Sequence, residues 1–320
     1  MVYFFSGGLT KDMVKYLTNM PDFEPIDVLV SQLDRSSIKE MIEYQKSGVV
    51  KQLFIDSGAF SVHTGKATVD LDEYISFVNS IDEHIHAIAQ LDTIPGTFGQ
   101  PKSREDYERS AKLSWENFLY MYERLKSPEK LIPVFHYGES FDALRNMLDW
   151  RDKDGKPLTY LGISPANDTS QNTKNIYMRE VYDFIAKSSN PNVRTHLFGM
   201  TALDALSKVP TYSADSVSHR LIGAYNKIYH PEFGVISLSK RSRTSKSKSS
   251  MSFVETCDDL ALKKLTDYLE HLGVTLEEVQ ESHSARCAVS MYGIIQYLKT
   301  HPYKPENVKR TKRLFSLPDT

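Results

Sequence analysis

Four side chains able to carry acid–base or nucleophilic chemistry stand where short apolar segments end. These side chains and the segments that they close are Asp56 after Leu53-Phe54-Ile55, Asp92 after Ile88-Ala89-Gln90-Leu91, His136 after Ile132-Pro133-Val134-Phe135, and Asp215 within Tyr212-Ser213-Ala214-Asp215-Ser216. In a barrel of parallel strands and helices, reactive side chains gather at the C-terminal ends of the strands. The pattern therefore predicts an enzyme.

Asp56 and Asp215 are the pair best suited to chemistry at a sugar C1′. One carboxylate can attack and form a covalent intermediate while the other protonates the departing base and deprotonates the incoming one. Retention of configuration by this route requires carboxyl groups about 5 Å apart. The competing interpretation is that each aspartate only caps the helix that follows it.

Asp92 and His136 are candidates for binding a base. Asp92 precedes the turn Thr93-Ile94-Pro95-Gly96, where a buried acceptor can recognise the N–H groups of a purine edge and reject a base without them; stabilisation of the turn is the alternative. His136 can donate to a carbonyl or stack, or it is an ordinary core histidine. Metal binding is not expected, because His84-Ile85-His86 stands at the entry of a strand.

Further candidates for the base site are small or apolar. Gly162 and Gly199 would let a flat ligand approach the backbone, or they relieve crowding inside a barrel. Ser57 follows Asp56 directly, and Phe60, Met200 and Tyr212 offer stacking surfaces or ordinary core packing. We predict Ser57, Gly199 and Met200 as members of the base site.

Short β-rich segments alternate with helical patterns up to about residue 230. The expected strands are Val2–Ser6, Asp27–Ser31, Gln52–Asp56, His86–Asp92, Leu131–His136, Thr159–Ser164, Arg194–Met200 and Tyr212–Ser216. Helices are expected over 71–78 and 104–126, and a reduced one over 202–208. Eight strands separated by helices predict a (β/α)₈ TIM barrel. An open doubly wound sheet is less favoured because no Gly-x-Gly-x-x-Gly follows the first strand.

The pattern changes after Tyr229. We expect the barrel to occupy residues 1–230, with residues 231–320 forming a basic loop and a C-terminal helical extension packed on it. Helices are expected near 260–272 and 285–298. The loop contains Lys240, Arg241, Arg243, Lys246 and Lys248, and a second basic run spans residues 309–313. These cations can neutralise nucleic-acid phosphates, although a solvated surface is the alternative.

Composition is that of a soluble globular protein. The 320 residues are 40% hydrophobic and 25% charged, with a formal net charge of −2. Only two cysteines occur, Cys257 and Cys287, far apart, which argues against a disulfide scaffold and a thiolate zinc site and suits a reducing cytoplasm. Neither a signal peptide nor a membrane-spanning segment is expected. We expect a cytoplasmic protein with no membrane partner.

Several of these segments, in order, resemble the tRNA-guanine transglycosylase superfamily over most of residues 50–220. The segments are Asp56-Ser57-Gly58-Ala59-Phe60, Leu91-Asp92, Val134-Phe135-His136-Tyr137-Gly138, Leu161-Gly162-Ile163, His196-Leu197-Phe198-Gly199 and Asp215-Ser216-Val217. The resemblance implies that Asp56 is the general acid/base, Asp215 the covalent nucleophile and Asp92 the reader of guanine. It also implies backbone recognition of the base near Gly162 and Ile163.

The departures from that family point to its DNA-modifying branch. His136 and Tyr137 stand where tRNA enzymes have a Gln-Gly pair, and the chain cannot supply the three cysteines of their Cys₃His zinc subdomain. A chain without that subdomain and with Ala214-Asp215-Ser216 looks most like the phage-type DNA 7-deazaguanine transglycosylases. Such an enzyme would act in the host cytoplasm and exchange guanine in DNA for free preQ0 or a related base, after flipping the target nucleotide.

The sequence leaves other functions open. A tRNA substrate would keep the same chemistry, and a catalytically silent barrel could serve as a nucleic-acid-binding subunit. No cofactor is expected. The partners expected are DNA, or tRNA in the alternative, and a free 7-deazaguanine base; a homodimer is left open. An amidohydrolase-like metal barrel is disfavoured because no His-x-His lies at a strand C-terminus.

Overall fold

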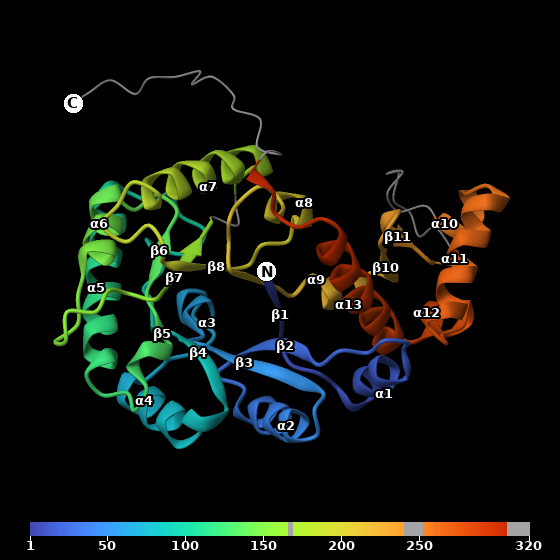
Figure 1. Cartoon of the computed structure of the whole chain (residues 1–320), viewed down its shortest axis with the longest axis horizontal. Helices are drawn as coiled ribbons and strands as arrows, with labels where there is room; N and C mark the ends of the chain where they lie inside the picture. The colour runs from blue at the N-terminus through green and yellow to red at the C-terminus, as the bar shows by residue number, and fades with distance from the viewer. Residues whose placement is uncertain (166–168, 240–251, 306–320) are drawn as a thin grey trace.

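The computed structural model describes residues 1–165, 169–239 and 252–305, and within them the chain forms a β/α barrel (Figure 1). Parallel strands follow the order β5-β4-β3-β2-β1-β9-β8-β7-β6. Their bounds are β1 Val2–Ser6, β2 Ile26–Ser31, β3 Val50–Asp56, β4 Ile85–Ala89, β5 Leu131–Ile132, β6 Val134–His136, β7 Tyr160–Ser164, β8 Arg194–Leu197 and β9 Ser213–Ser216. The predicted (β/α)₈ barrel is confirmed.

One predicted strand, 131–136, is divided in two and closes the barrel. β5 pairs with β4, and β6 pairs with β7. Pro133 lies between the two segments and has no N–H to donate to a strand ladder. Its carbonyl still accepts the Gly162 N–H at 2.8 Å. At Pro133 the strand therefore changes its pairing partner from β4 to β7, and the sheet stays continuous across the interruption.

Alternation along the strands separates an inner core from an outer one. The inner core contains Phe4, Leu29, Phe54, Ala87, Ala89, Ile132 and Tyr160, which pack together inside the barrel. Because successive side chains point to opposite faces of a strand, residues two positions after these inner residues also point inward, at the C-terminal mouth. Ser6 follows Phe4 in this way, Asp56 follows Phe54, and Asp215 follows the buried Ser213. The register thus places both predicted catalytic carboxylates at one end of the barrel.

Helices surround the barrel and pack on its outer core. The helices between the barrel strands are α1 Lys11–Asn19, α2 Arg35–Lys46, α3 Ala59–His63, α4 Leu71–Ser80, α5 Arg104–Tyr122, α6 Phe141–Asp149, α7 Gln171–Ile185 and α8 Leu203–Leu206, with short 3₁₀ turns η1 Asp82–His84 and η2 Pro128–Lys130. The expected helices over 71–78 and 104–126 are present as α4 and α5. The reduced helix predicted before the last strand is α8.

The chain after β9 adds α9 Ser218–Ala224, a hairpin of β10 Lys227–His230 and β11 Gly234–Ser237, and α10 Phe253–Thr256, α11 Asp259–His271, α12 Leu276–Glu281 and α13 His283–Thr300. The expected C-terminal helices correspond to α11 and α13. The sequence did not predict the hairpin. α13 packs against α1, α9 and β10, which fixes the C-terminal segment to the barrel (Figure 1). Across the described residues, every helix is too short or too polar to cross a bilayer.

Candidate active site

Three donors surround the carboxylate of Asp215, which is only 6% exposed. Ser6 Oγ donates to its Oδ2 at 2.6 Å, and the Gly199 N–H donates to its Oδ1 at 2.9 Å. His196 Nε2 lies 3.2 Å from the same Oδ1. Three strands of the barrel therefore hold one carboxylate at its mouth: β1 through Ser6, the end of β8 through Gly199 and His196, and β9 through Asp215 itself.

His196 connects Asp215 to a chain of hydroxyl groups inside the barrel. His196 Nδ1 lies 2.7 Å from Ser213 Oγ, and Ser213 Oγ is also hydrogen-bonded to the Tyr160 hydroxyl. The imidazole is fully buried, and the ring of Phe54 is 4.8 Å away, edge to face. Because His196, Ser213 and Tyr160 are all buried, the hydrogen-bond donors and acceptors of these three side chains must satisfy one another.

Asp56 occupies the mouth of the barrel at the end of β3, and its environment favours the protonated form. Its Oδ2 accepts the Gly58 N–H at 3.0 Å. Burial, together with the negative charges of Asp92 and Asp215, raises the pKa of Asp56 to about 7. A carboxyl group that titrates near neutrality can donate a proton in one step and accept it in the next.

Asp92, His136 and Glu139 form a second buried cluster beside Asp56. His136 Nε2 lies 2.7 Å from Asp92 Oδ2, and its Nδ1 lies 3.0 Å from Glu139 Oε1. The His136 backbone N–H donates to Glu139 Oε2 at 3.2 Å, and Ser57 Oγ donates to Asp92 Oδ1 at 3.2 Å. Every described polar atom of the imidazole is thus used within the cluster, and His136 has no free N–H for a ligand carbonyl.

The two carboxylates control the charge of His136. Burial acts to lower its pKa, but hydrogen bonds to Asp92 and Glu139 and their negative charges outweigh it and raise the pKa of His136 to about 10. At neutral pH the ring is therefore an imidazolium between two acidic groups. Asp92 keeps lone pairs on both oxygens beyond those used by His136 and Ser57, because an ionised carboxylate has about four acceptor positions. The free positions suit a ligand with adjacent N–H donors.

Helix capping does not explain Asp56 or Asp215. The N-cap of α3 is Gly58, the N-cap of α9 is Val217, and neither makes a side-chain cap bond. Helix α5, which follows Asp92, is capped by Ser103. The capping interpretation of Asp56 and Asp215 is therefore wrong. Asp92 bonds across the barrel mouth to Ser57 and His136.

The structure does not bring all the predicted base-site residues to this cluster. The Gly199 N–H donates to Asp215 Oδ1. A Cβ on Gly162 would lie 2.6 Å from the Phe198 ring, so Phe198 already fills the space that the glycine leaves. Ile163 is fully buried in the outer core, and its carbonyl accepts the Phe198 N–H at 3.0 Å. Met200 is also a member of the outer core, only 2% exposed.

Three residues of these networks were not predicted as site residues: Ser6, His196 and Glu139. Ser6 ends the first strand, so the same strand-end signal that marked Asp56 could have marked it. His196 lies within a segment already noted for Gly199. Glu139 follows His136 by three residues, a spacing that a turn after β6 converts into contact.

The predicted backbone contacts Lys240, Arg241, Arg243, Lys246 and Lys248 lie outside the described residues, as does the basic run 309–313. Among the residues that are described, no group of three or more His, Cys, Asp or Glu side chains is placed to hold a metal ion. No family model matches the chain, and no curated protein matches it.

Proposed function

We propose that this protein is a transglycosylase that exchanges guanine in DNA for a free 7-deazaguanine base through a covalent intermediate on Asp215. The observation that carries the proposal is the contrast between two carboxyl groups at one barrel mouth. Asp215 receives three hydrogen-bond donors, whereas the pKa of Asp56 is raised to about 7 by burial and by neighbouring charge. Such divergent environments assign one group to nucleophilic attack and the other to proton transfer.

In the first half of the reaction, an oxygen of Asp215 attacks C1′ of the flipped deoxyguanosine. The C1′–N9 bond breaks, its electron pair leaves with the base, and protonated Asp56 supplies the proton that neutralises the base. In the second half, N9 of the deazapurine attacks C1′ and its proton passes to Asp56. The C1′–O bond breaks, and Asp215 returns to a carboxylate with net retention at C1′.

The geometry favours Asp215 Oδ2 as the attacking oxygen. Oδ1 lies against Gly199 N–H and His196 Nε2, whereas Oδ2, among the described residues, accepts the rotatable hydroxyl of Ser6 alone. The two fixed donors at Oδ1 stabilise the carboxylate form, which is the leaving group of the second half-reaction. This division lets one residue act first as nucleophile and then as leaving group.

Asp92 supplies the recognition of the base. Its free lone pairs can accept the N1–H and 2-amino hydrogens shared by guanine and 7-deazaguanines, and a base lacking them would leave a buried acceptor unpaired. DNA is favoured over tRNA by sequence: two cysteines cannot supply the three thiolates of the tRNA enzymes' zinc subdomain. This part of the proposal rests on the family resemblance.

The test is incorporation of labelled guanine into duplex DNA and into tRNA, run in parallel with unmodified protein, Asp215→Asn and the exposed control Asp204→Asn. We expect exchange into DNA, its loss in Asp215→Asn together with the covalent protein–DNA adduct, and retention in Asp204→Asn. Exchange that survives Asp215→Asn would refute the nucleophile. Incorporation into tRNA alone would refute the polymer, and binding without any exchange would identify a silent nucleic-acid-binding barrel.

A further inference from the structure

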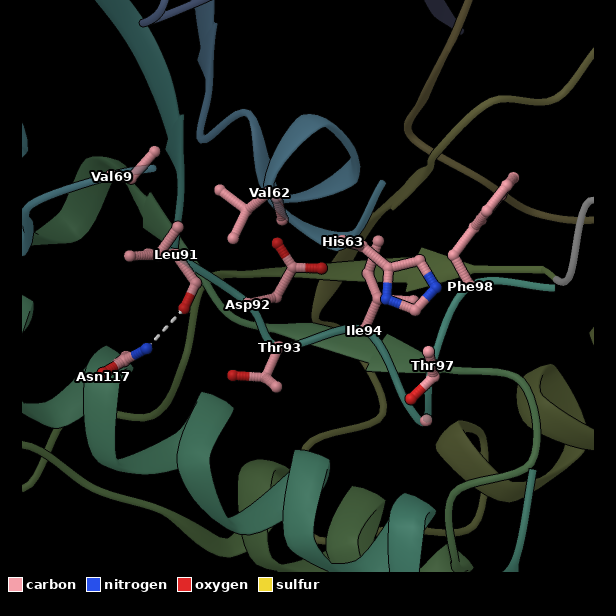
Figure 2. A pocket seen from close by; sticks show the side chains of 12 residues that line it. Val62, His63, Val69, Leu91, Asp92, Thr93, Ile94, Thr97, Phe98 and Asn117 are labelled. Carbon is pink, nitrogen blue, oxygen red and sulfur yellow. Dashed lines mark hydrogen bonds between the residues drawn. The ribbon is translucent and has the colours of Figure 1, made fainter. Parts of the chain in front are cut away.

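A cavity of about 380 Å³ opens beside Asp92, between α3 and the segment that joins β4 to α5 (Figure 2). Its lining, drawn from the described residues, includes Asp92 but not Asp56, His136 or Asp215. The cavity therefore shares Asp92 with the proposed base site and extends from it along α3 and the segment after β4. Its volume lies at the lower end of the range of small-molecule sites.

The walls of this cavity are mainly apolar and are held in place by α5. Val62, Val69, Leu91 and Ile94 line it. Asn117 Nδ2 donates to the Leu91 carbonyl at 2.8 Å, as the dashed line in Figure 2 shows. On the other side of Asp92, the Thr93 N–H donates to Ser114 Oγ at 2.8 Å. Apolar walls beside a fixed carboxylate suit a flat heteroaromatic group.

Two solvent-exposed aromatic rings lie at this cavity. Phe98 is 59% exposed and Phe60 is 57% exposed. Their centroids are 6.4 Å apart with an interplanar angle of 87°, and His63 packs edge to face with Phe98 at 5.9 Å. Two phenyl rings that are not covered by the protein offer faces on which a base can stack.

A cation lies at the rim. The Lys102 side chain runs along Gly96, where a Cβ would meet Lys102 Cγ at 3.0 Å. Its charge also contributes, after burial, to lowering the pKa of His63. Within the described part of the chain, Lys102 forms no ion pair, so its charge remains available to an anion outside the cavity.

From these features we infer that the cavity binds a second planar nucleobase, that of a nucleotide adjacent to the target on the same strand, with Lys102 at the intervening phosphate. The inference rests on the proposed function, because it requires the target base to occupy the neighbouring site. Stacking on Phe98 would hold the strand on one side of the extruded nucleotide, and it would make binding depend on a base that is not exchanged.

The test combines Phe98→Ala with oligonucleotides in which the base 5′ or 3′ of the target guanine is removed. We expect Phe98→Ala to weaken oligonucleotide binding, measured by fluorescence anisotropy, by about ten-fold. One of the two abasic substrates should weaken binding to unmodified protein by a similar factor. The two changes together should cost little more than either alone, because they remove the same interaction. Leu260→Ala, which removes an equally exposed apolar side chain on α11, is the control.

Lys102→Met should reduce the salt dependence of binding by about one phosphate contact, and Lys187→Met, at the end of α7, should not. Additive losses for Phe98→Ala and both abasic substrates would overturn the inference. So would a Phe98→Ala protein that binds oligonucleotides normally but has lost affinity for the free deazapurine, since the cavity would then hold the free base. Because binding is measured separately from exchange, absence of exchange would refute only the proposed function.

Discussion

His196 Nε2 and Asp215 Oδ1 lie 3.2 Å apart, and this contact determines which nitrogen of the ring carries the proton. A carboxylate can only accept, so Nε2 must be the protonated nitrogen. Burial holds the pKa of Tyr160 above its usual range, so its hydroxyl keeps its proton and can donate to Ser213. With Nε2–H directed at Asp215, Nδ1 can accept the Ser213 Oγ–H. This series of buried hydrogen bonds thus orients His196 Nε2–H toward Asp215, the proposed nucleophile.

Removing the hydroxyl of Ser213 or of Tyr160 should change the hydrogen bonding of His196 while leaving the imidazole in place. We expect Ser213→Ala and Tyr160→Phe to lower the turnover rate about ten-fold, the equivalent of one net hydrogen bond, with little change in KM for DNA. ¹⁵N NMR of the His196 ring should show a single Nε2–H tautomer in the unmodified protein and a mixture in Ser213→Ala. Tyr182→Phe is the matched control, because the buried Tyr182 hydroxyl bonds to Thr195 and takes no part in the hydrogen bonds that join Tyr160, Ser213 and His196. An unchanged tautomer in Ser213→Ala would disprove the orienting role.

The raised pKa of Asp56 predicts the pH dependence of the first half-reaction. The proton that Asp56 donates is present below about pH 7 and is lost above it. The single-turnover rate of adduct formation should therefore be constant at lower pH and fall about ten-fold per unit well above pH 7. Asp56→Asn should be slow throughout and should lack this descending limb. A limb that persists in Asp56→Asn would assign the titration to another group.

The raised pKa of His136 predicts a change in stability over a different pH range. A folded-state pKa of about 10 exceeds the ordinary value of 6.5, so the folded protein holds a proton that the unfolded chain loses between these values. The free energy of unfolding should consequently decline as pH rises from about 7 to 10. His136→Gln should show a shallower decline in denaturant titrations at pH 7 and 9.5. The exposed His271→Gln, on α11, should retain the decline of the unmodified protein.

Much of this architecture could be predicted because the strands are short, apolar and regularly spaced. Strand ends gave the positions of Asp56 and Asp215, and alternation along each strand brings both to the barrel mouth. The sequence could not provide the partners. Ser6 and Asp215 are separated by 209 positions and meet only because β1 pairs with β9 in one particular register. That register depends on packing across the whole sheet rather than on local residue types.

Gly162 also shows that local sequence cannot identify contacts between distant residues. Gly162 could be predicted to allow a close approach, but the approaching group is Phe198 of the protein itself. The β10–β11 hairpin was not predicted because each strand has only four residues and β10 packs on α13, far along the sequence. Such short segments carry little periodicity of their own. Long-range packing decides these features, and single-sequence patterns do not record it.

Gly58 connects the backbone of the barrel mouth to Asp56, the proposed proton-transfer group. Its φ of +80° lies in the left-handed region, and its N–H donates to Asp56 Oδ2 at 3.0 Å. A Cβ at this position would lie 2.6 Å from Leu33 Cδ1. Gly65, seven positions later and just after the end of α3, has a φ of +69° but no heavy atom within 4 Å of its Cβ position. The two glycines therefore share backbone strain but not the steric conflict.

We expect Gly65→Ala to lower the free energy of unfolding by about 1 kcal/mol, the cost of a left-handed alanine. Gly58→Ala should lose more, about 2 kcal/mol in total, because the partly exposed Leu33 side chain must also move aside. It should also slow exchange, since displacement of the Gly58 N–H releases Asp56. Adding Leu33→Ala to the Gly58→Ala variant should remove the extra loss in the free energy of unfolding, but not the part caused by the positive φ. Equal stability of the two alanine variants would show that Leu33 does not confine this turn, and that Asp56 is positioned by something other than the space around Gly58.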